Sequence, residues 1–346
     1  MLTPEAIKAK AAEVGFDVCG IARAERHPKL ARLRSWIDEG RAGDMHYLRA
    51  SIDERIDVSA VLPTARSVIS LATVYNTAQP YSRDAIAPGR AAVARYAWGD
   101  DYHDELRVRL RRLVGWMAGT AGPGLEAFSC VDNGPIQERV FAERAGVGWI
   151  GKNTCVIHPR LGSWLFLAEI VTNAELEPDA PALDQCGTCM RCLEACPTGA
   201  ITEPYTVDAT RCLSYLTIET RAPIEPALRP AIEHHVFGCD ICQDVCPWNR
   251  RAAVSDDPAW QPRDALAFPS LLALCRLSDA GWRDLLAGSA MRRAGLRRIR
   301  RSLAYATTHL PADEASAALG ALAGHPSGQE PEVAPAIAWA RAQVLP

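Results

Sequence analysis

Hydrophobic and polar positions follow two different periods in the first half of the chain. Short runs rich in Val, Ile and Leu predict buried strands, and they lie at 16–22, 67–75, 125–131 and 163–172. Between these runs, apolar residues recur at helical spacing. Helices are predicted up to Gly15, up to Gly40, and at 101–118 and 135–145. This alternation over residues 1–172 predicts a layered α/β domain.

The pattern changes after residue 172. A proline-bearing linker at 177–181 precedes a segment, 182–255, that holds eight of the twelve cysteines. Beyond a second linker at about 255–263, only helical periodicity remains, rich in Leu, Ala and Arg. We therefore predict three domains: 1–172, 173–255 and a helical, repeat-like region at 256–346.

Composition is that of an ordinary globular protein. The chain has 346 residues, 48% of them hydrophobic, and a formal net charge of −3, so any contact with nucleic acid must come from a local basic patch. The N-terminal segment has neither the basic nor the apolar part of an export signal, and no apolar run reaches membrane-spanning length. We expect a cytoplasmic protein whose clustered cysteines are metal ligands rather than disulfides.

The first cysteine run has the spacing of a bacterial ferredoxin. It reads Cys186-x2-Cys189-x2-Cys192-x3-Cys196-Pro197. Three closely spaced thiolates bind one [4Fe–4S] cluster, and the fourth, before proline, ligates the other cluster.

A second, shorter run completes the pattern: Cys239-x2-Cys242-x3-Cys246-Pro247, with Cys212 between the two runs. The crossing rule predicts a first set of Cys186, Cys189, Cys192 and Cys246, and a second set of Cys196, Cys212, Cys239 and Cys242. Structural zinc is the alternative, because paired C-x2-C units also bind it. The triplet and the two Cys-Pro endings favour two clusters and electron transfer.

Two features of the first domain have competing interpretations. Gly146–Gly151 fits the dinucleotide motif G-x-G-x-x-G, with Glu169 as the later acid, but it follows a helix instead of a strand. A turn packed against a ligand or another backbone is therefore favoured. Asp132 lies between a strand and a helix, where it is either a turn residue or catalytic; a helix N-terminus would favour its charged form.

Other polar residues are less specific. His103 and His158 are interpreted as structural or surface residues, and the isolated Cys19, Cys130, Cys155 and Cys275 are given no function. A short segment without acids carries Arg292, Arg293, Arg297, Arg298, Arg300 and Arg301. Its default interpretation is a solvated face, but six arginines also suit a phosphate backbone.

Several motifs together resemble the epoxyqueuosine reductase family of tRNA-modifying enzymes. They are RYAWGDDYH at 95–103, VDNGPI at 131–136, AGVGWIGKNT at 145–154, GSWLF at 162–166, CLSYLTIE at 212–219, CPWN at 246–249 and both cysteine runs. The resemblance covers about residues 1–255 closely, and the remainder matches only in being helical.

The resemblance implies a nitroreductase- and reductive-dehalogenase-like cobalamin domain, a two-cluster ferredoxin-like domain and a HEAT-like region that contacts tRNA. The implied reaction is the reduction of epoxyqueuosine to queuosine at the wobble position of tRNA, with Asp132 as proton donor. The implied cobalamin contacts are Arg55, Tyr96, Asp132, Asn153, His158, Ser214 and Thr217. The sequence lacks D-x-H-x-x-G, because Leu106 replaces the glycine, so corrin ligation by a histidine of that motif is not supported.

The implied partners are a tRNA carrying epoxyqueuosine and an external one-electron donor such as a flavodoxin or ferredoxin. We expect a monomer and no membrane. Three other classes remain open: a reductive dehalogenase, a two-cluster electron carrier and a tRNA-binding module with structural zinc. The absorption spectrum of the anaerobically purified protein separates them.

Overall fold

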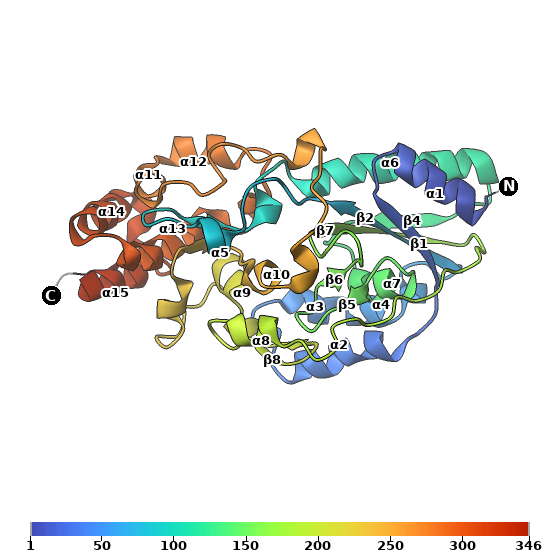
Figure 1. Cartoon of the computed structure of the whole chain (residues 1–346), viewed down its shortest axis with the longest axis horizontal. Helices are drawn as coiled ribbons and strands as arrows, with labels where there is room; N and C mark the ends of the chain where they lie inside the picture. The colour runs from blue at the N-terminus through green and yellow to red at the C-terminus, as the bar shows by residue number, and fades with distance from the viewer. Residues whose placement is uncertain (1, 345–346) are drawn as a thin grey trace.

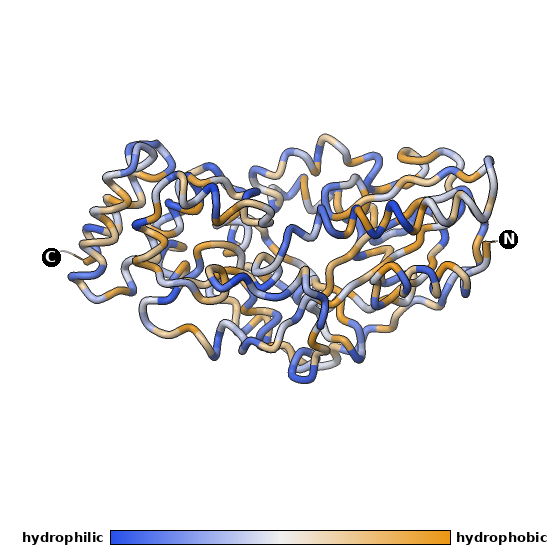
Figure 2. Tube along the Cα trace, turned by 90° about the horizontal axis from the view of Figure 1, so that it is seen from above, coloured by the Kyte–Doolittle hydropathy of each residue, from blue (hydrophilic) through white to orange (hydrophobic). Residues whose placement is uncertain are grey.

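The computed structural model describes residues 2–344 and is elongated, with the chain ends at opposite tips (Figure 1). Hydrophobic residues run through both halves of the molecule (Figure 2). No helix in these residues is both long and apolar enough to cross a membrane.

The N-terminal half is built on an antiparallel sheet of order β1-β2-β7-β4. The strands are β1 Val18–Arg23, β2 Ser67–Val74, β7 Leu165–Thr172 and β4 Ala127–Cys130. All four predicted strands are therefore confirmed. Both β2 and β7 are mostly apolar and mostly buried because helices cover both faces of the sheet.

Alternate residues of β2 face different helical layers. Ile69 and Leu71 pack with α1 (Pro4–Glu13) and α6 (Tyr102–Ala121), whereas Val68 and Ala72 pack with α2 (Pro28–Asp38) and α7 (Glu138–Arg144). Two short helices follow α2, namely α3 His46–Ala50 and α4 Ile52–Ile56. The result is a three-layer α/β/α arrangement.

The glycine-rich segment forms a turn, as favoured above. It leads from α7 into the hairpin β5 (Trp149–Ile150) and β6 (Val156–Ile157). Gly146 has φ +72°, and a Cβ there would lie 2.6 Å from the carbonyl oxygen of Ala180. Close backbone packing thus explains the glycine, and the antiparallel sheet excludes the dinucleotide interpretation.

The cysteine-bearing segment lies between the sheet and the C-terminal helices. Its elements are α8 Arg191–Ala195, β8 Ile201–Glu203, β9 Thr206–Val207, α9 Leu213–Ile218, β10 His235–Phe237 and α10 Ile241–Asp244. β10 pairs in parallel with β3 (Ala92–Val93), which follows the short helix α5 (Ser82–Ala85). A piece of the N-terminal chain is therefore built into this middle region.

The C-terminal region consists of packed helices, in agreement with the predicted periodicity. They are α11 Leu271–Arg276, α12 Asp279–Leu286, α13 Gly295–Ala306, α14 Ala312–Gly324 and α15 Ala334–Val344. Their apolar faces form one core with Ala91, Val93 and Trp98 of the N-terminal chain. The HEAT-like repeat character stays a prediction.

Candidate active site

Asp132 lies immediately beyond β4, on the loop that leads to α7. Its backbone is in the left-handed region at φ +54°, and its side chain is half exposed. The Tyr102 hydroxyl donates a hydrogen bond to Asp132 Oδ2 at 2.9 Å, and His103 Nε2 lies 3.4 Å from the same oxygen. The strand end and the start of α6 together aim these side chains at one point.

His103 connects Asp132 to a second carboxylate. Its Nδ1 lies 2.8 Å from Oδ1 of Asp101, which also caps the first turn of α6 by accepting from the His103 amide. Burial alone would lower the pKa of His103, but hydrogen bonds to Asp101 and Asp132 raise it to about 9. The interpretation of His103 as a structural residue is compatible with these contacts, and the sequence pattern did not indicate a partner 29 positions away.

The ionisation of Asp132 follows from the same contacts. Burial alone would raise the pKa of the Asp132 carboxyl, but hydrogen bonds from His103 and Tyr102 outweigh it and lower the pKa. At neutral pH the proton of this pair therefore resides on the imidazole. Tyr102 is fixed between the rings of His103 and Phe166, at centroid distances of 4.1 and 4.4 Å.

Side chains from three distant segments surround Asp132. Tyr96 packs edge-on against Tyr102, and its pKa is raised by burial and by the charge of Asp132. Tyr47 of α3 lies beneath the guanidinium of Arg293, which donates to Glu219 Oε1 at 2.7 Å. The hydrophobic pattern of the sequence did not predict that Tyr47 and Arg293 lie near Asp132.

The cysteines gather in the two predicted groups. A small pocket is lined by the first set, together with Lys152, Trp248 and neighbouring residues. Its cysteines are Cys186, Cys189, Cys192 and Cys246. The ammonium of Lys152 donates to the carbonyls of Gly187 and Cys189 and so fixes this loop. Four convergent thiols with no disulfide suit a [4Fe–4S] cluster.

The second group lies beside the segment that carries Tyr96. Cys239 interacts electrostatically with Cys212 and Cys196, and Cys242 with Cys239 and Cys212. Burial raises the pKa of the Cys239 thiol well above its ordinary value. Its loop packs against the Tyr96 segment, since Oδ2 of Asp240 accepts from the Arg95 amide at 2.6 Å. The group thus adjoins the side of the site that carries Tyr96.

A ninth cysteine accompanies the second group. The thiols of Cys155 and Cys242 are close enough for each to shift the pKa of the other, and the Asn153 side-chain amide donates to the Cys242 carbonyl at 3.3 Å. Asn153 Oδ1 in turn accepts from the Cys155 amide. The contacts of Cys155 and Asn153 with Cys242 were not predicted, because these residues are far apart in the sequence.

The expected cobalamin contacts have different surroundings. Arg55 is buried in α4 and is near enough to Cys130 and Asp132 to share their electrostatic environment. His158 accepts with Nδ1 from the backbone amides of Arg160 and Leu161 in its own turn, and the backbone amide of Ser214 is close enough to the Cys212 thiol to lower its pKa.

Thr217 corrects the prediction. It is 0% exposed, and its hydroxyl joins Leu213 to Gly238. A side chain fully covered by protein offers no surface to a cofactor, so its expected cobalamin contact was wrong.

The arginine segment also requires a correction. Arg300 and Arg301 are 0% exposed. Arg300 pairs with Asp279, and Arg301 donates to carbonyls of residues 216, 220 and 222. Their predicted contact with tRNA was wrong, because both guanidinium groups are buried and bind partners inside the protein.

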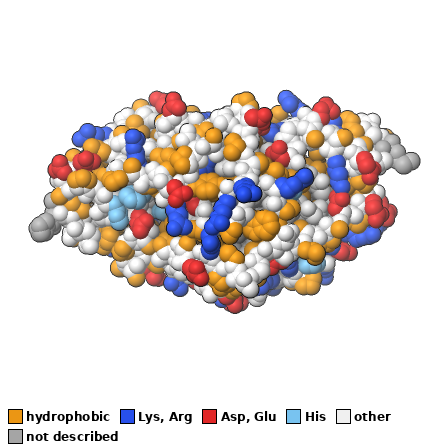
Figure 3. Space-filling model, viewed as in Figure 1, with side chains coloured by type: hydrophobic (Ala, Val, Ile, Leu, Met, Phe, Trp, Pro, Cys, Tyr) orange, Lys and Arg blue, Asp and Glu red, His pale blue; other side chains and the backbone are white. Residues whose placement is uncertain are grey.

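The other four arginines stay near the surface: Arg292, Arg293 and Arg297 are exposed and Arg298 is partly buried. Arg292 and Arg293 influence the pKa of Asp101 and Asp132, so this end of the segment adjoins the site. On the face shown in Figure 3, Lys and Arg side chains gather near the middle of the molecule.

A bound corrin is compatible with part of this geometry. Arg55 and Tyr96 both flank Asp132, and the carboxyl of Asp132 remains half exposed. Both ring nitrogens of His103 already face carboxylates, so this imidazole is not free to coordinate cobalt. The structure therefore agrees with the departure from D-x-H-x-x-G.

Known proteins match both the sequence and the fold. Residues 185–249 match the model of a 4Fe-4S double cluster binding domain, and residues 55–133 match the model described as epoxyqueuosine reductase QueG, DUF1730. An epoxyqueuosine reductase of Gloeobacter violaceus is 46% identical over 310 residues, 87% of this chain and 95% of the relative.

Two solved structures are similar over nearly the whole chain. A crystal structure of epoxyqueuosine reductase with a tRNA-Tyr epoxyqueuosine-modified tRNA stem loop has a TM-score of 0.89 and 31% identity, covering 98% of this chain and 89% of that one. A Bacillus subtilis epoxyqueuosine reductase, with its catalytic aspartate loop swung out of the active site, has a TM-score of 0.88 and 30% identity, covering 98% and 90%.

Proposed function

The chain belongs to the epoxyqueuosine reductase family, and from this premise we propose that it reduces epoxyqueuosine to queuosine in tRNA, the final step of queuosine formation. The observation that carries the proposal is the series Asp101–His103–Asp132. His103 is hydrogen-bonded to Asp101, and its Nε2 lies 3.4 Å from the half-exposed carboxylate of Asp132. Removal of the epoxide oxygen as water consumes two electrons and two protons, so a proton source at this point meets a chemical requirement.

The first of the two protons delivered to the substrate oxygen comes from the His103–Asp132 pair, and the second comes from solvent through the half-exposed Asp132 carboxylate. Because Asp132 is ionised and His103 is protonated at neutral pH, the proton starts on His103 Nε2, which faces Asp132 Oδ2. Asp132 passes it to the departing oxygen, and Tyr102 keeps the carboxylate oriented. General acid catalysis of this kind contributes about 10²- to 10⁴-fold.

The electrons come from groups that the chain binds. When bound, two [4Fe–4S] clusters and a cobalamin supply the two-electron reducing power that opens the epoxide. The proposed ligands are Cys186, Cys189, Cys192 and Cys246 for one cluster, and Cys196, Cys212, Cys239 and Cys242 for the other. Arg55, Tyr96 and Asp132 flank the cobalamin in this proposal.

The surroundings of the two groups suggest the direction of electron flow. The loop of Cys186 and Cys189 is exposed at Gly187 and Thr188. Cys239 instead lies between the buried Gly238 and Asp240, and Asp240 joins it to the Tyr96 segment. We place the external one-electron donor, such as a flavodoxin or ferredoxin, at the first group. The enzyme acts as a cytoplasmic monomer in this proposal.

The substrate tRNA approaches along the C-terminal side of the site. Arg292 and Arg293 adjoin Asp101 and Asp132, and both guanidinium groups are exposed enough to meet phosphates. We further propose that the Asp132 loop has two positions, as the Bacillus subtilis relative suggests.

One experiment separates this function from its rivals. The anaerobically purified, cobalamin-loaded protein is mixed with a chemical reductant and an epoxyqueuosine-containing tRNA stem loop, and the nucleosides are analysed by mass spectrometry. The proposal expects iron–sulfur and corrin absorption and a nucleoside that has lost one oxygen. Clusters without conversion would indicate an electron carrier, and a colourless zinc protein would indicate a binding module.

A further inference from the structure

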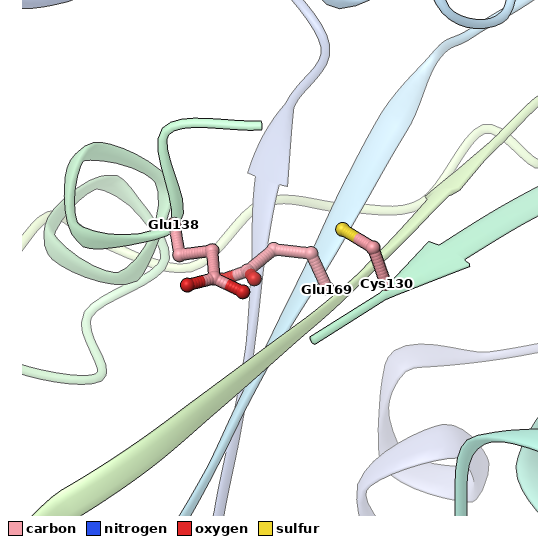
Figure 4. A group of neighbouring side chains, drawn as sticks. All are labelled: Cys130, Glu138 and Glu169. Carbon is pink, nitrogen blue, oxygen red and sulfur yellow. The ribbon is translucent and has the colours of Figure 1, made fainter. Parts of the chain in front are cut away.

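An acidic pair, with Glu169 buried and Glu138 partly buried, lies behind the Asp132 loop. Glu169 stands in the middle of β7, and Glu138 opens α7 above it (Figure 4). One carboxylate oxygen from each, together with Cys130 Sγ, all lie within 4.8 Å of one another. Figure 4 shows the two carboxyl groups directed toward each other.

Glu169 is an unusual residue for a central strand. It is 0% exposed, and Ser70 donates to its Oε1 at 3.1 Å, while its Oε2 has no hydrogen-bond partner within residues 2–344. It lies on the face of the sheet where Val171 packs with Phe141 of α7. A buried carboxyl oxygen without a protein donor requires a proton of its own or a bound cation.

The charged groups around the pair do not neutralise it. Neither glutamate takes part in a salt bridge within the described chain, and Arg139 donates instead to Thr154. Charged or titratable groups face the pair from the loop, β4, α4, α6 and α7. They are Asp132, Cys130, Arg55, Tyr102 and Arg139.

A shared proton explains the pair better than a metal ion. Burial, reinforced by the charge of Asp132, raises the pKa of Glu138 to about 8. Burial and the nearby Glu138 raise the pKa of Glu169 as well. Burial also raises the pKa of the Cys130 thiol, which therefore stays protonated and is a poor metal ligand.

Glu138 has a second contact that concerns catalysis. Its Oε1 accepts a hydrogen bond from the backbone amide of Asp132 at 2.5 Å. Asp132 is a non-glycine residue at φ +54°, a conformation that must be held by its surroundings. Within this arrangement Glu138 is the acceptor that holds the Asp132 backbone.

We propose that Glu138 and Glu169 form a one-proton latch that positions Asp132. The shared proton bonds the two carboxyl groups, so that Glu138 stays beneath the loop and Asp132 stays in the site. When the proton leaves, the two adjacent carboxylates repel each other, Glu138 moves toward solvent, and the loop is released. This role rests on the proposed function of Asp132, and Glu138 and Glu169 are positioning residues within it.

Hydrogen–deuterium exchange of the loaded enzyme tests the latch. In the wild type, protection of the 131–137 amides, corrected for the intrinsic rate, should fall as the pH rises through about 8. Glu169→Gln always presents a donor to Glu138, so its protection should stay constant over this range. Glu138→Ala should lose protection about tenfold or more at every pH, since a charge-assisted hydrogen bond is removed.

The control is Glu177→Gln, which removes one charge from an exposed position in the linker and should behave as the wild type. The rate of epoxide reduction gives an independent measure. In the wild type, this rate should fall as the pH rises past about 8. In Glu169→Gln, the fall should move toward pH 9, where His103 loses its proton.

Three results would overturn the proposal. They are an unchanged alkaline loss of protection in Glu169→Gln, a protected Asp132 amide in Glu138→Ala, and a stoichiometric metal that Glu169→Gln loses. The exchange experiment does not depend on turnover. The predicted protection in a protein that reduces no epoxyqueuosine would contradict the proposed function and leave the latch standing.

Discussion

Asp101→Asn is expected to lower the proton affinity of His103 without disturbing the helix that carries it. Asp101 Oδ1 lies 2.8 Å from His103 Nδ1, whereas the contact of His103 Nε2 with Asp132 is 3.4 Å. Asparagine also caps helices well and presents an oxygen at the same place. The substitution therefore removes the charge and keeps the shape.

The size of the effect follows from the pKa of His103. A pKa of about 9, against 6.5 for an ordinary histidine, corresponds to roughly 3 kcal/mol in favour of the protonated form. Hydrogen bonds to charged acceptors are about twice as strong as neutral ones. With the charge of the nearer acceptor lost, we expect the proton affinity to fall by about tenfold or more.

The raised pKa of His103 determines how its contribution to folding stability changes with pH. Because the folded pKa is raised, the stability contributed by His103 is fully present below pH 6.5 and disappears as the pH rises through about 9. In the Asp101→Asn protein, His103 should contribute less to the free energy of unfolding at low pH. This contribution should also disappear at a lower pH than in the wild type.

Titration of isotope-labelled histidine by nuclear magnetic resonance measures this directly, with the His103 signal identified from His103→Gln. The matched control is Asp104→Asn, which removes a neighbouring carboxylate paired with Arg107 instead of His103. An unchanged midpoint in Asp101→Asn, or an equal change in Asp104→Asn, would refute the reasoning.

Two further predictions concern the clusters and the tRNA. Cys246→Ser should damage the cluster of Cys186, Cys189 and Cys192, although it lies over fifty residues away. Iron analysis and paramagnetic resonance that show this cluster intact and the other disturbed would reverse the crossed assignment. Replacing Arg292 and Arg297 with Gln should weaken tRNA binding and flatten its salt dependence. Fluorescence anisotropy that shows unchanged affinity at every salt concentration would make these arginines a solvated face.

Local patterns predicted the elements well, because their causes are local. The apolar runs at 67–75 and 163–172 became β2 and β7, and Thr3-Pro4 begins α1 with the Thr3 hydroxyl accepting from the Ala6 amide. The predicted helix at 135–145 begins later, at Glu138, because residues 133–137 form the loop behind Asp132.

Long-range contacts could not be predicted in the same way. The strand β3 forms by pairing with β10, and this partner lies over 140 residues later in the sequence. A local pattern could not predict it. Arg300 and Arg301 resembled a basic surface, since the carboxylate and carbonyls that bind them come from other segments. His103 likewise acquires its role from Asp132, and Glu169 from Glu138.

We propose that this chain reduces epoxyqueuosine with a proton delivered through Asp132. The most direct test is single-turnover reduction of an epoxyqueuosine-containing tRNA stem loop by wild-type and Asp132→Asn protein, each loaded with clusters and cobalamin and followed by nucleoside mass spectrometry. The account predicts equal absorption spectra for the two proteins, with loss of the epoxide oxygen slowed by at least about 10² in the variant. A variant that binds both cofactors and forms queuosine at the wild-type rate would contradict it.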